Sequence, residues 1–421
     1  RLIASAIALA LMAHGAIAAD ASVEQKLEIL QKELDELRAE LAKMKSQQAA
    51  PTTNAAAAVA SAPSGTMSGI AAGSNTFGGY GELHYNNFKD GDKKDEIDFH
   101  RFVLFFGHKF TDNLRFHSEL ELEHAFAATG RTGEVELEQA FVDYRVNDAF
   151  NFKAGAFLVP MGIINETHEP TTFFGVERNE IESRIIPTTW REACVGVHGE
   201  IMQGLRYDAG IISSMDAGRF NAPASAVRSM RTSFSNAAAH DFAVYSALNY
   251  RGIPGLAVGA SVFTGNTGQN GASDAALKSV NGRLLLWDIH AQYRLGGLEL
   301  RGLYARGTLG DADKITAAAN TRSGSNSAIA PSSFWGYYAE AGYHFQLGDE
   351  MELSPFARYE RYNTQASVPS GFSADKKNNE RVTTLGVNFK LHPQVVFKAD
   401  YQDFREDPQK DRFNLGVGYM F

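Results

Sequence analysis

From Phe77 to the end of the chain, apolar and polar residues alternate with a period of two, and no other feature constrains the fold more. The segment 114–123 shows this most clearly, because Leu, Phe, Ser, Leu and Leu alternate there with Arg, His and Glu. Similar segments of about ten residues recur, which is the length that a tilted strand needs to cross a bilayer. Strands of soluble sandwiches are usually shorter and joined by evenly short turns. The pattern therefore predicts a transmembrane β-barrel.

Sixteen such segments can be counted, and the connections between them alternate between short and long. Seven short and eight long connections are what sixteen up-and-down strands with both ends on one side of the membrane require. We predict an all-β fold, a 16-stranded antiparallel barrel over residues 77–421. The predicted strands are 77–87, 97–108, 114–126, 134–146, 150–159, 191–201, 204–213, 240–251, 255–264, 284–295, 297–307, 334–347, 350–362, 381–391, 394–405 and 410–421.

The first 76 residues divide into three segments. Residues 1–19 combine an apolar run with a small-residue end, which predicts a secretory signal peptide. Residues 20–45 carry apolar side chains in steps of four and three, which predicts a short α-helical coiled coil in the periplasm. An amphipathic helix on the protein's own barrel is the alternative, but so narrow a stripe favours self-association. Residues 46–76 are rich in Ala, Ser, Thr and Gly and predict a flexible linker. The coiled-coil seam is Val23, Leu27, Leu30, Leu34, Leu37, Leu41 and Met44.

Composition excludes several other classes of protein. The net charge of −9 argues against nucleic-acid binding, so no nucleic-acid partner is expected. The lone cysteine, Cys194, excludes an intramolecular disulfide. The lack of a long apolar stretch after the first twenty residues argues against a helical membrane protein. The twelve histidines are scattered and no nucleophile–base spacing stands out, so we predict no catalytic residues, no metal site and no cofactor.

The loop 160–190 is long but contains many large apolar residues, among them Ile163, Ile164, Phe173, Phe174 and Ile181. A loop in external water would not expose so many, so we expect it to fold inward against the barrel wall. Packing at a subunit interface is the alternative. If the loop folds inward, its polar side chains would form a pore constriction together with the start of the next strand. They are Glu166, His168, Glu169, Glu177, Arg178, Asn179, Glu180, Glu182, Arg184 and Arg191.

If the apolar face of each strand meets lipid, the opposite face lines the lumen. The expected pore-lining residues include Arg115, His117, Glu119, Glu121, Glu123, Arg294, Arg301 and Arg358. We expect Arg178, Arg184 and Arg191 to face the acidic row Glu119, Glu121 and Glu123 across the lumen. Bulges that shift the phase are expected at 138–139 and at 304–305.

The last strand alternates outward-facing large residues with small or polar ones and ends at the aromatic Phe421. This resembles the recognition signal of bacterial outer-membrane proteins. The barrel-assembly machinery and outer-membrane lipid are therefore expected partners, and the outer membrane of a Gram-negative bacterium is the expected location.

The segments 154–162 (AGAFLVPMG), 174–179 (FGVERN) and 187–190 (PTTW) resemble the phosphate-selective porin O/P superfamily and related trimeric porins with an N-terminal coiled coil. The resemblance covers residues 77–421 and implies a homotrimer of barrels, each pore being narrowed by the third external loop. Phosphate selectivity would need a cationic path, but the predicted inward strand faces carry more carboxylates than Arg and Lys. We therefore expect passive diffusion of small hydrophilic solutes and ions, with weak charge bias. An anion-, phosphate- or dicarboxylate-selective porin is the alternative.

Three other classes of protein are alternatives to a channel. An outer-membrane barrel enzyme would need a catalytic constellation, and an envelope tether would leave a charged lumen without a role. A plugged transporter is disfavoured because the segment before the barrel is too small and polar to fill a large lumen. We therefore predict a protein that is not an enzyme.

Overall fold

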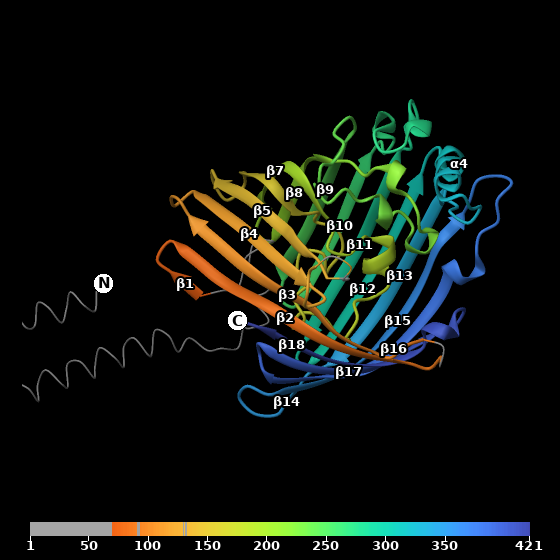
Figure 1. Ribbon diagram of the computed structural model, residues 1–421. Helices are drawn as coiled ribbons and strands as arrows, with labels where there is room; N and C mark the ends of the chain where they lie inside the picture. The colour runs from red at the N-terminus through yellow and green to blue at the C-terminus, as the bar shows by residue number, and fades with distance from the viewer. Residues whose placement is uncertain (1–69, 91–92, 129, 131–132) are drawn as a thin grey trace, which may run out of the picture. The chain divides into compact units, whose positions relative to one another are not determined.

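The computed structural model describes residues 70–90, 93–128, 130 and 133–421. The predicted signal peptide, the coiled coil and most of the linker lie outside these residues. The described part is one antiparallel sheet that closes on itself, because each strand pairs with the next and β18 pairs with β2 (Figure 1). Closure leaves no free sheet edge, as a membrane-spanning sheet requires.

The sheet contains eighteen strands, of which β1 is a three-residue strand beside β2 and β14 continues β13. Sixteen strands therefore form the barrel, and the predicted antiparallel fold is confirmed. The bounds are β1 Ile70–Ala72, β2 Asn75–Phe88, β3 Glu96–Lys109, β4 Leu114–Glu123, β5 Val135–Arg145, β6 Asn151–Leu158, β7 Arg191–Met202, β8 Leu205–Ser213, β9 Phe242–Ile253, β10 Leu256–Gly265, β11 Leu284–Leu295, β12 Leu298–Leu309, β13 Ser333–Tyr343, β14 Phe345–Gln346, β15 Glu352–Ser367, β16 Asn379–His392, β17 Val395–Phe404 and β18 Arg412–Met420.

Among the residues that the structure describes, helical structure is confined to the connections between strands. The helix α4 (Ala312–Ser323) lies between β12 and β13, and a π-helical turn, η1 (Ile181–Ile185), lies between β6 and β7. Short 3-10 turns are η2 Ala217–Arg219, η3 Pro223–Ser225, η4 Arg228–Met230, η5 Gln269–Gly271, η6 Ala275–Leu277, η7 Lys376–Asn378 and η8 Pro408–Lys410. Within the described residues, no helix has the length and apolar character needed to cross a membrane.

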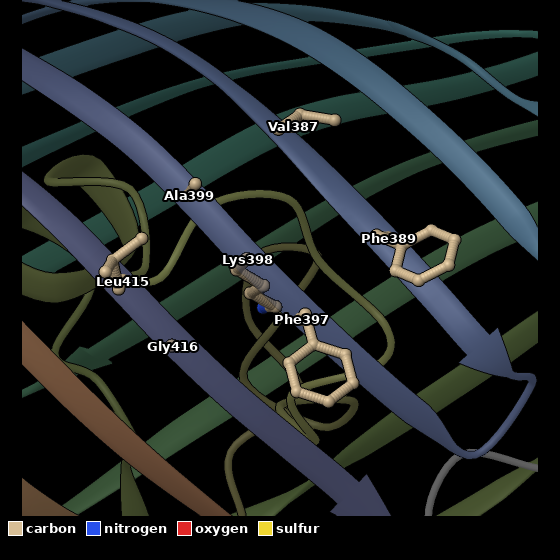
Figure 2. A pocket seen from close by; sticks show the side chains of 7 residues that line it. All are labelled: Val387, Phe389, Phe397, Lys398, Ala399, Leu415 and Gly416. Atoms are coloured by element: carbon tan, nitrogen blue, oxygen red, sulfur yellow. The ribbon is translucent and has the colours of Figure 1, made fainter.

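The outer face of the barrel carries large exposed apolar side chains, as contact with lipid requires. Examples are Phe106, Leu120, Leu137, Val142, Val244, Ile289 and Leu385. A hollow of about 300 Å³ lies on this face over β16–β18. Figure 2 shows the side chains that border it, among them Phe389, Phe397 and Leu415. The hollow belongs to the lipid-facing surface and not to the lumen.

The inner face is not uniformly polar, which differs from the predicted lining. Near the long connections it carries apolar side chains, including Phe141, Phe157, Tyr245, Phe263, Leu286, Leu303 and Phe334. These pack with apolar residues of the connections that fold into the barrel, and together they form one buried core. The large external loops therefore have a hydrophobic anchorage inside the barrel wall.

This inner core explains one wrong prediction. The bulge expected at 138–139 is confirmed, because the pairing of β4 with β5 shifts there and leaves Glu138 as the extra residue. The bulge expected at 304–305 is absent, since β12 pairs without a shift with both β11 and β13. Leu303, Ala305 and Leu309 face inward as part of the core. Because these inward-facing residues are apolar, the sequence pattern looked like a shift in the alternation between inward-facing and outward-facing positions.

Candidate functional site

The connection between β6 and β7, residues 159–190, folds into the barrel and is called the inner loop below. Its two ends are tied together by Asn165, whose amide nitrogen donates to the carbonyl oxygens of Val159 (2.7 Å) and Trp190 (3.0 Å). The Asn165 side-chain oxygen accepts from the Trp190 amide at 2.7 Å. All three residues are buried. A single asparagine therefore closes the base of the loop.

Replacing Asn165 by alanine is expected to destabilise the barrel by about 2–4 kcal/mol, because it leaves buried backbone groups without partners. Thermal unfolding of the purified protein, followed by circular dichroism, measures this. Asn113→Ala is the matched control, because Asn113 is exposed in the turn 110–113. An equal loss of stability in both variants would contradict the role given to Asn165.

The apolar residues of the inner loop are buried inside the barrel, as expected from the sequence. Ile181, Ile185 and Ile186 are fully buried in the inner core, while Phe173 and Phe174 are buried near the tip of the loop. The Phe174 ring stacks on Phe356 of β15 with centroids 5.2 Å apart. The hydrophobic effect therefore holds the loop against the inside of the wall.

Glu182 is the central polar anchor of the inner loop. Its carboxylate accepts hydrogen bonds from the backbone amides of Ile163 (2.5 Å) and Ile164 (2.7 Å). It also accepts from the Asn179 amide and from the hydroxyl of Tyr338 on β13, both at 2.9 Å. Burial raises the pKa of this carboxyl, and the hydrogen bonds oppose that rise. Glu182 was predicted to line a constriction, but the structure gives it a buried, structural position.

The tip of the inner loop is held by charged side chains of the opposite wall. Lys398 of β17 donates to the carbonyl oxygen of Gly175 at 2.7 Å, and Asp400 accepts from the Val176 amide at 2.6 Å. Arg301 of β12 donates to the carbonyl oxygen of Thr172 at 2.9 Å. The loop therefore crosses the lumen from β6–β7 to β12–β17, and it does not lie on the outside of the barrel.

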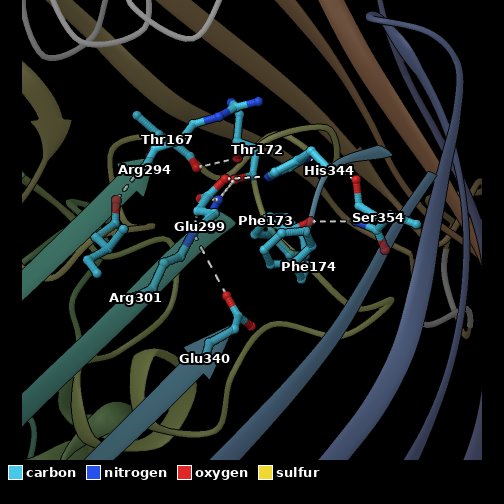
Figure 3. A network of polar contacts seen from close by, with 12 residues as sticks. Thr167, Thr172, Phe173, Phe174, Arg294, Glu299, Arg301, Glu340, His344 and Ser354 are labelled. Carbon is cyan, nitrogen blue, oxygen red and sulfur yellow. Dashed lines mark hydrogen bonds and ion pairs between the residues drawn. The ribbon is translucent and has the colours of Figure 1, made fainter. Parts of the chain in front are cut away.

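Figure 3 shows the charged network around this tip. Arg301 pairs with Glu299 at 2.5 Å and lies 3.9 Å from Glu340. His344 bridges Glu299 (2.8 Å) and Glu352 (2.7 Å). Each carboxylate of the network thus has a cationic or imidazole partner, so this part of the wall adds little unbalanced negative charge.

The other predicted constriction residues divide between buried and half-buried positions. Glu180 is buried, pairs with Arg184, and its backbone amide donates to Glu360 at 2.6 Å. Glu177 is half-buried and accepts from Asn86 of β2 at 3.0 Å. Glu166 and Glu169 are half-buried, whereas His168 is buried.

The predicted opposition of an arginine row and an acidic row is wrong. Arg191 pairs with Glu136 on the neighbouring wall, Arg184 pairs with Glu180, and Arg178 donates to Thr188 and Thr189. The charged groups therefore pair with near neighbours instead of across the lumen.

The predicted lining residues on the strands also pair locally. Glu119 accepts from Gln139 at 2.6 Å, and Glu121 lies 3.3 Å from Arg101. Arg358 is buried against Glu340 and Glu360. Of the others, Arg115 is exposed, while His117, Glu123 and Arg294 are half-buried.

Two arginines next to the inner loop were missed. Arg228 and Arg231 lie in the connection between β8 and β9, and they donate to the carbonyl oxygens of Ser183 (3.5 Å) and Thr188. Among the described residues, no ion pair joins either of them, or Arg178, to a carboxylate. The segment 214–239 carries three arginines but only one carboxylate, a signal that was present in the sequence.

These arginines lie close enough to repel one another. Burial lowers the pKa of Arg228, and the positive charges of Arg178 and Arg184 lower it further. Burial and the charge of Arg228 likewise lower the pKa of Arg231. The three half-buried residues Arg178, Arg228 and Arg231 are called the arginine cluster below. The cluster places positive potential beside the inner loop.

A closed antiparallel barrel with an apolar outer face, and with a loop held across its interior by charged wall residues, defines a channel protein of the Gram-negative outer membrane. The sequence profile of the family described as "Phosphate-selective porin O and P" matches residues 70–414. The chain belongs to this family and is an outer-membrane porin. The family and the fold indicate a channel rather than an enzyme.

One relative and two solved structures are similar to this chain. A protein of Aquifex aeolicus (strain VF5), described as an uncharacterized protein, is 36% identical over 355 residues, which cover 82% of this chain and 80% of the relative. Salmonella typhi OmpF, solved in complex with daunomycin, has a TM-score of 0.57 at 12% identity and covers 82% of this chain and 97% of its own. The outer membrane channel DcaP of Acinetobacter baumannii has a TM-score of 0.51 at 12% identity and covers 84% and 100%. At these identities the two structures support the fold alone.

Proposed function

We propose that the inner loop forms the narrow section of a pore through which small hydrophilic solutes and ions diffuse passively. One observation carries the proposal: the loop crosses the lumen and is held at its far end by Arg301, Lys398 and Asp400. A loop anchored at both ends constricts a barrel without closing it as a separate plug domain would. Half-buried polar groups such as Glu166, Glu169 and Glu177 leave a hydrated surface beside the loop.

A preference for anions is the second candidate, and the arginine cluster favours it. The predicted inward strand faces carry more carboxylates than Arg and Lys, which predicts only a weak charge bias. Many of those carboxylates form ion pairs with Arg, Lys or His. In contrast, no ion pair among the described residues joins Arg178, Arg228 or Arg231 to a carboxylate. Unbalanced guanidinium groups raise the local concentration of anions. Phosphate is the probe that the family description suggests.

We also propose that the protein is a homotrimer with its coiled coil, residues 20–45, in the periplasm, and that Phe421 contributes to recognition by the barrel-assembly machinery. The regular heptads over residues 23–44 support self-association.

Single-channel recording of the purified full-length protein in a planar bilayer, with a salt gradient, tests these proposals. The expected result is conductance that rises in groups of three equal steps, with a reversal potential that shows a preference for anions. Added phosphate is expected to lower the chloride current if it binds at the arginine cluster. A folded protein without conductance would contradict the pore, and a cation preference would contradict the role of the cluster.

A further inference from the structure

The bulge in β5 places an extra carboxylate on the inside of the barrel. Glu119 pairs with Gln139 in the strand register, and Leu120 pairs with Leu137, so Glu138 is left over between them. A bulge of this kind re-aims side chains, and here both Glu138 and Gln139 face inward. Glu138 is 0% exposed, and neither of its carboxylate oxygens accepts a hydrogen bond. A guanidinium nitrogen of Arg191 lies 3.9 Å away.

The inner loop brings a histidine to this carboxylate. His168 is 3% exposed, and its Nε2 atom lies 3.5 Å from Glu138 and 3.8 Å from Glu119. Its Nδ1 atom lies 3.0 Å from the carbonyl oxygen of Asn165. Because a carbonyl oxygen only accepts, Nδ1 carries the proton of this hydrogen bond, and Nε2 faces the two carboxylates without a hydrogen-bond partner. A histidine oriented through Nδ1 in this way is the usual arrangement of a metal ligand.

The local charge balance also leaves room for a cation. Glu119, Glu121 and Glu138 are all buried within this part of the wall. Arg101 is shared between Glu121 and Glu82, and the short ion pair of Arg191 is with Glu136. Buried carboxylates without full compensation are costly, so they are normally neutralised by a cation or by a proton.

We propose that Glu119, Glu138 and His168 bind one divalent transition-metal ion, with Zn²⁺ as the best match, and that the ion links the inner loop to β4 and β5. The three possible ligand atoms lie within 4.8 Å of one another. Zinc bonds of about 2.0–2.2 Å in a tetrahedral site place neighbouring ligands roughly 3.3–3.6 Å apart. The observed distances of 3.5 and 3.8 Å are close to this spacing and long for direct hydrogen bonds. Imidazole with carboxylates suits zinc better than calcium.

A second group, Asp98, His100 and His124, has a similar composition but carries less weight. Asp98 already contacts both imidazoles, at 3.3 Å from His100 and 2.9 Å from His124, and all three residues are half-buried. These groups satisfy one another without an ion. They are therefore the natural control for metal binding elsewhere in the chain.

The test uses full-length, detergent-purified protein that is treated with EDTA, dialysed and titrated with Co²⁺, whose visible absorption reports its coordination. The expected result is one Co²⁺ per chain with strong visible bands, displaced by Zn²⁺. Glu138→Gln and His168→Gln are each expected to weaken binding by at least about 100-fold, because losing a ligand costs more than losing one of its supporting contacts. His124→Gln is expected to bind like the wild type. This measurement reports metal binding alone, so its outcome does not depend on whether the protein conducts ions.

A further readout covers variants that fold poorly. Zn²⁺ is expected to raise the unfolding temperature of the wild type and of His124→Gln, but not of His168→Gln. If the wild-type protein took up no Co²⁺, the proposal would be overturned. The charge of the buried carboxylates would then be neutralised by shared protons. Binding that survives in both Glu138→Gln and His168→Gln, or that is lost in His124→Gln, would overturn it as well.

Discussion

Replacing Glu182 by alanine is expected to free the inner loop from the wall and to raise the single-channel conductance. The change leaves the amides of Ile163 and Ile164, the Asn179 side chain and the Tyr338 hydroxyl without their acceptor. Unpaired buried donors cost about 1–3 kcal/mol each, so the loss weakens loop docking by at least about 3 kcal/mol. That is more than a hundredfold in the ratio of docked to undocked loop. Conductance in a planar bilayer measures the effect.

Two controls separate loop release from general damage. Glu182→Gln keeps one acceptor oxygen and the shape of the side chain, so its conductance is expected to lie nearer the wild type. Glu350→Ala removes an exposed carboxylate in the short turn between β14 and β15 and is expected to change nothing. A folded Glu182→Ala barrel with wild-type conductance would show that the inner loop does not limit the pore.

The double change Arg228→Gln, Arg231→Gln is expected to abolish the preference for anions. A unit charge about 5 Å from an ion in water contributes about 0.8 kcal/mol, which is roughly a fourfold change in local ion concentration. Two such charges act on anions and cations in opposite directions, so the permeability ratio is expected to change more than tenfold at low salt. The reversal potential under a salt gradient measures this ratio, and added salt is expected to reduce the difference.

Arg405→Gln is the matched control, because it removes one positive charge from an exposed position next to β17. Its reversal potential is expected to stay within the range of the wild type. If the double variant also kept the wild-type reversal potential, the arginine cluster would not lie along the path of the ions.

Much of the barrel follows from the sequence alone. Lipid contact on one side forces alternate residues to be apolar, and this local requirement is visible at every strand from β2 to β18. The hydrophobic effect also made the inner loop recognisable in the sequence, because large apolar side chains such as Ile181 and Phe174 are not stable in water and must be buried. The bulge at Glu138 was also predicted, since two polar residues in succession break the period of two.

Only the tertiary structure decided what the inward side chains contact. Leu303 and Ala305 face the lumen because the external connections fold in and provide them with an apolar partner, which no local pattern records. Arg228 lies beside Arg178, and His168 lies beside Glu138, although each pair is far apart in the sequence. Alternation along a strand is set by the solvent on each side of that strand, whereas pairing inside the barrel depends on how loops close over long distances. The sequence by itself determined the wall of this porin, and the folding of the loops determined its interior.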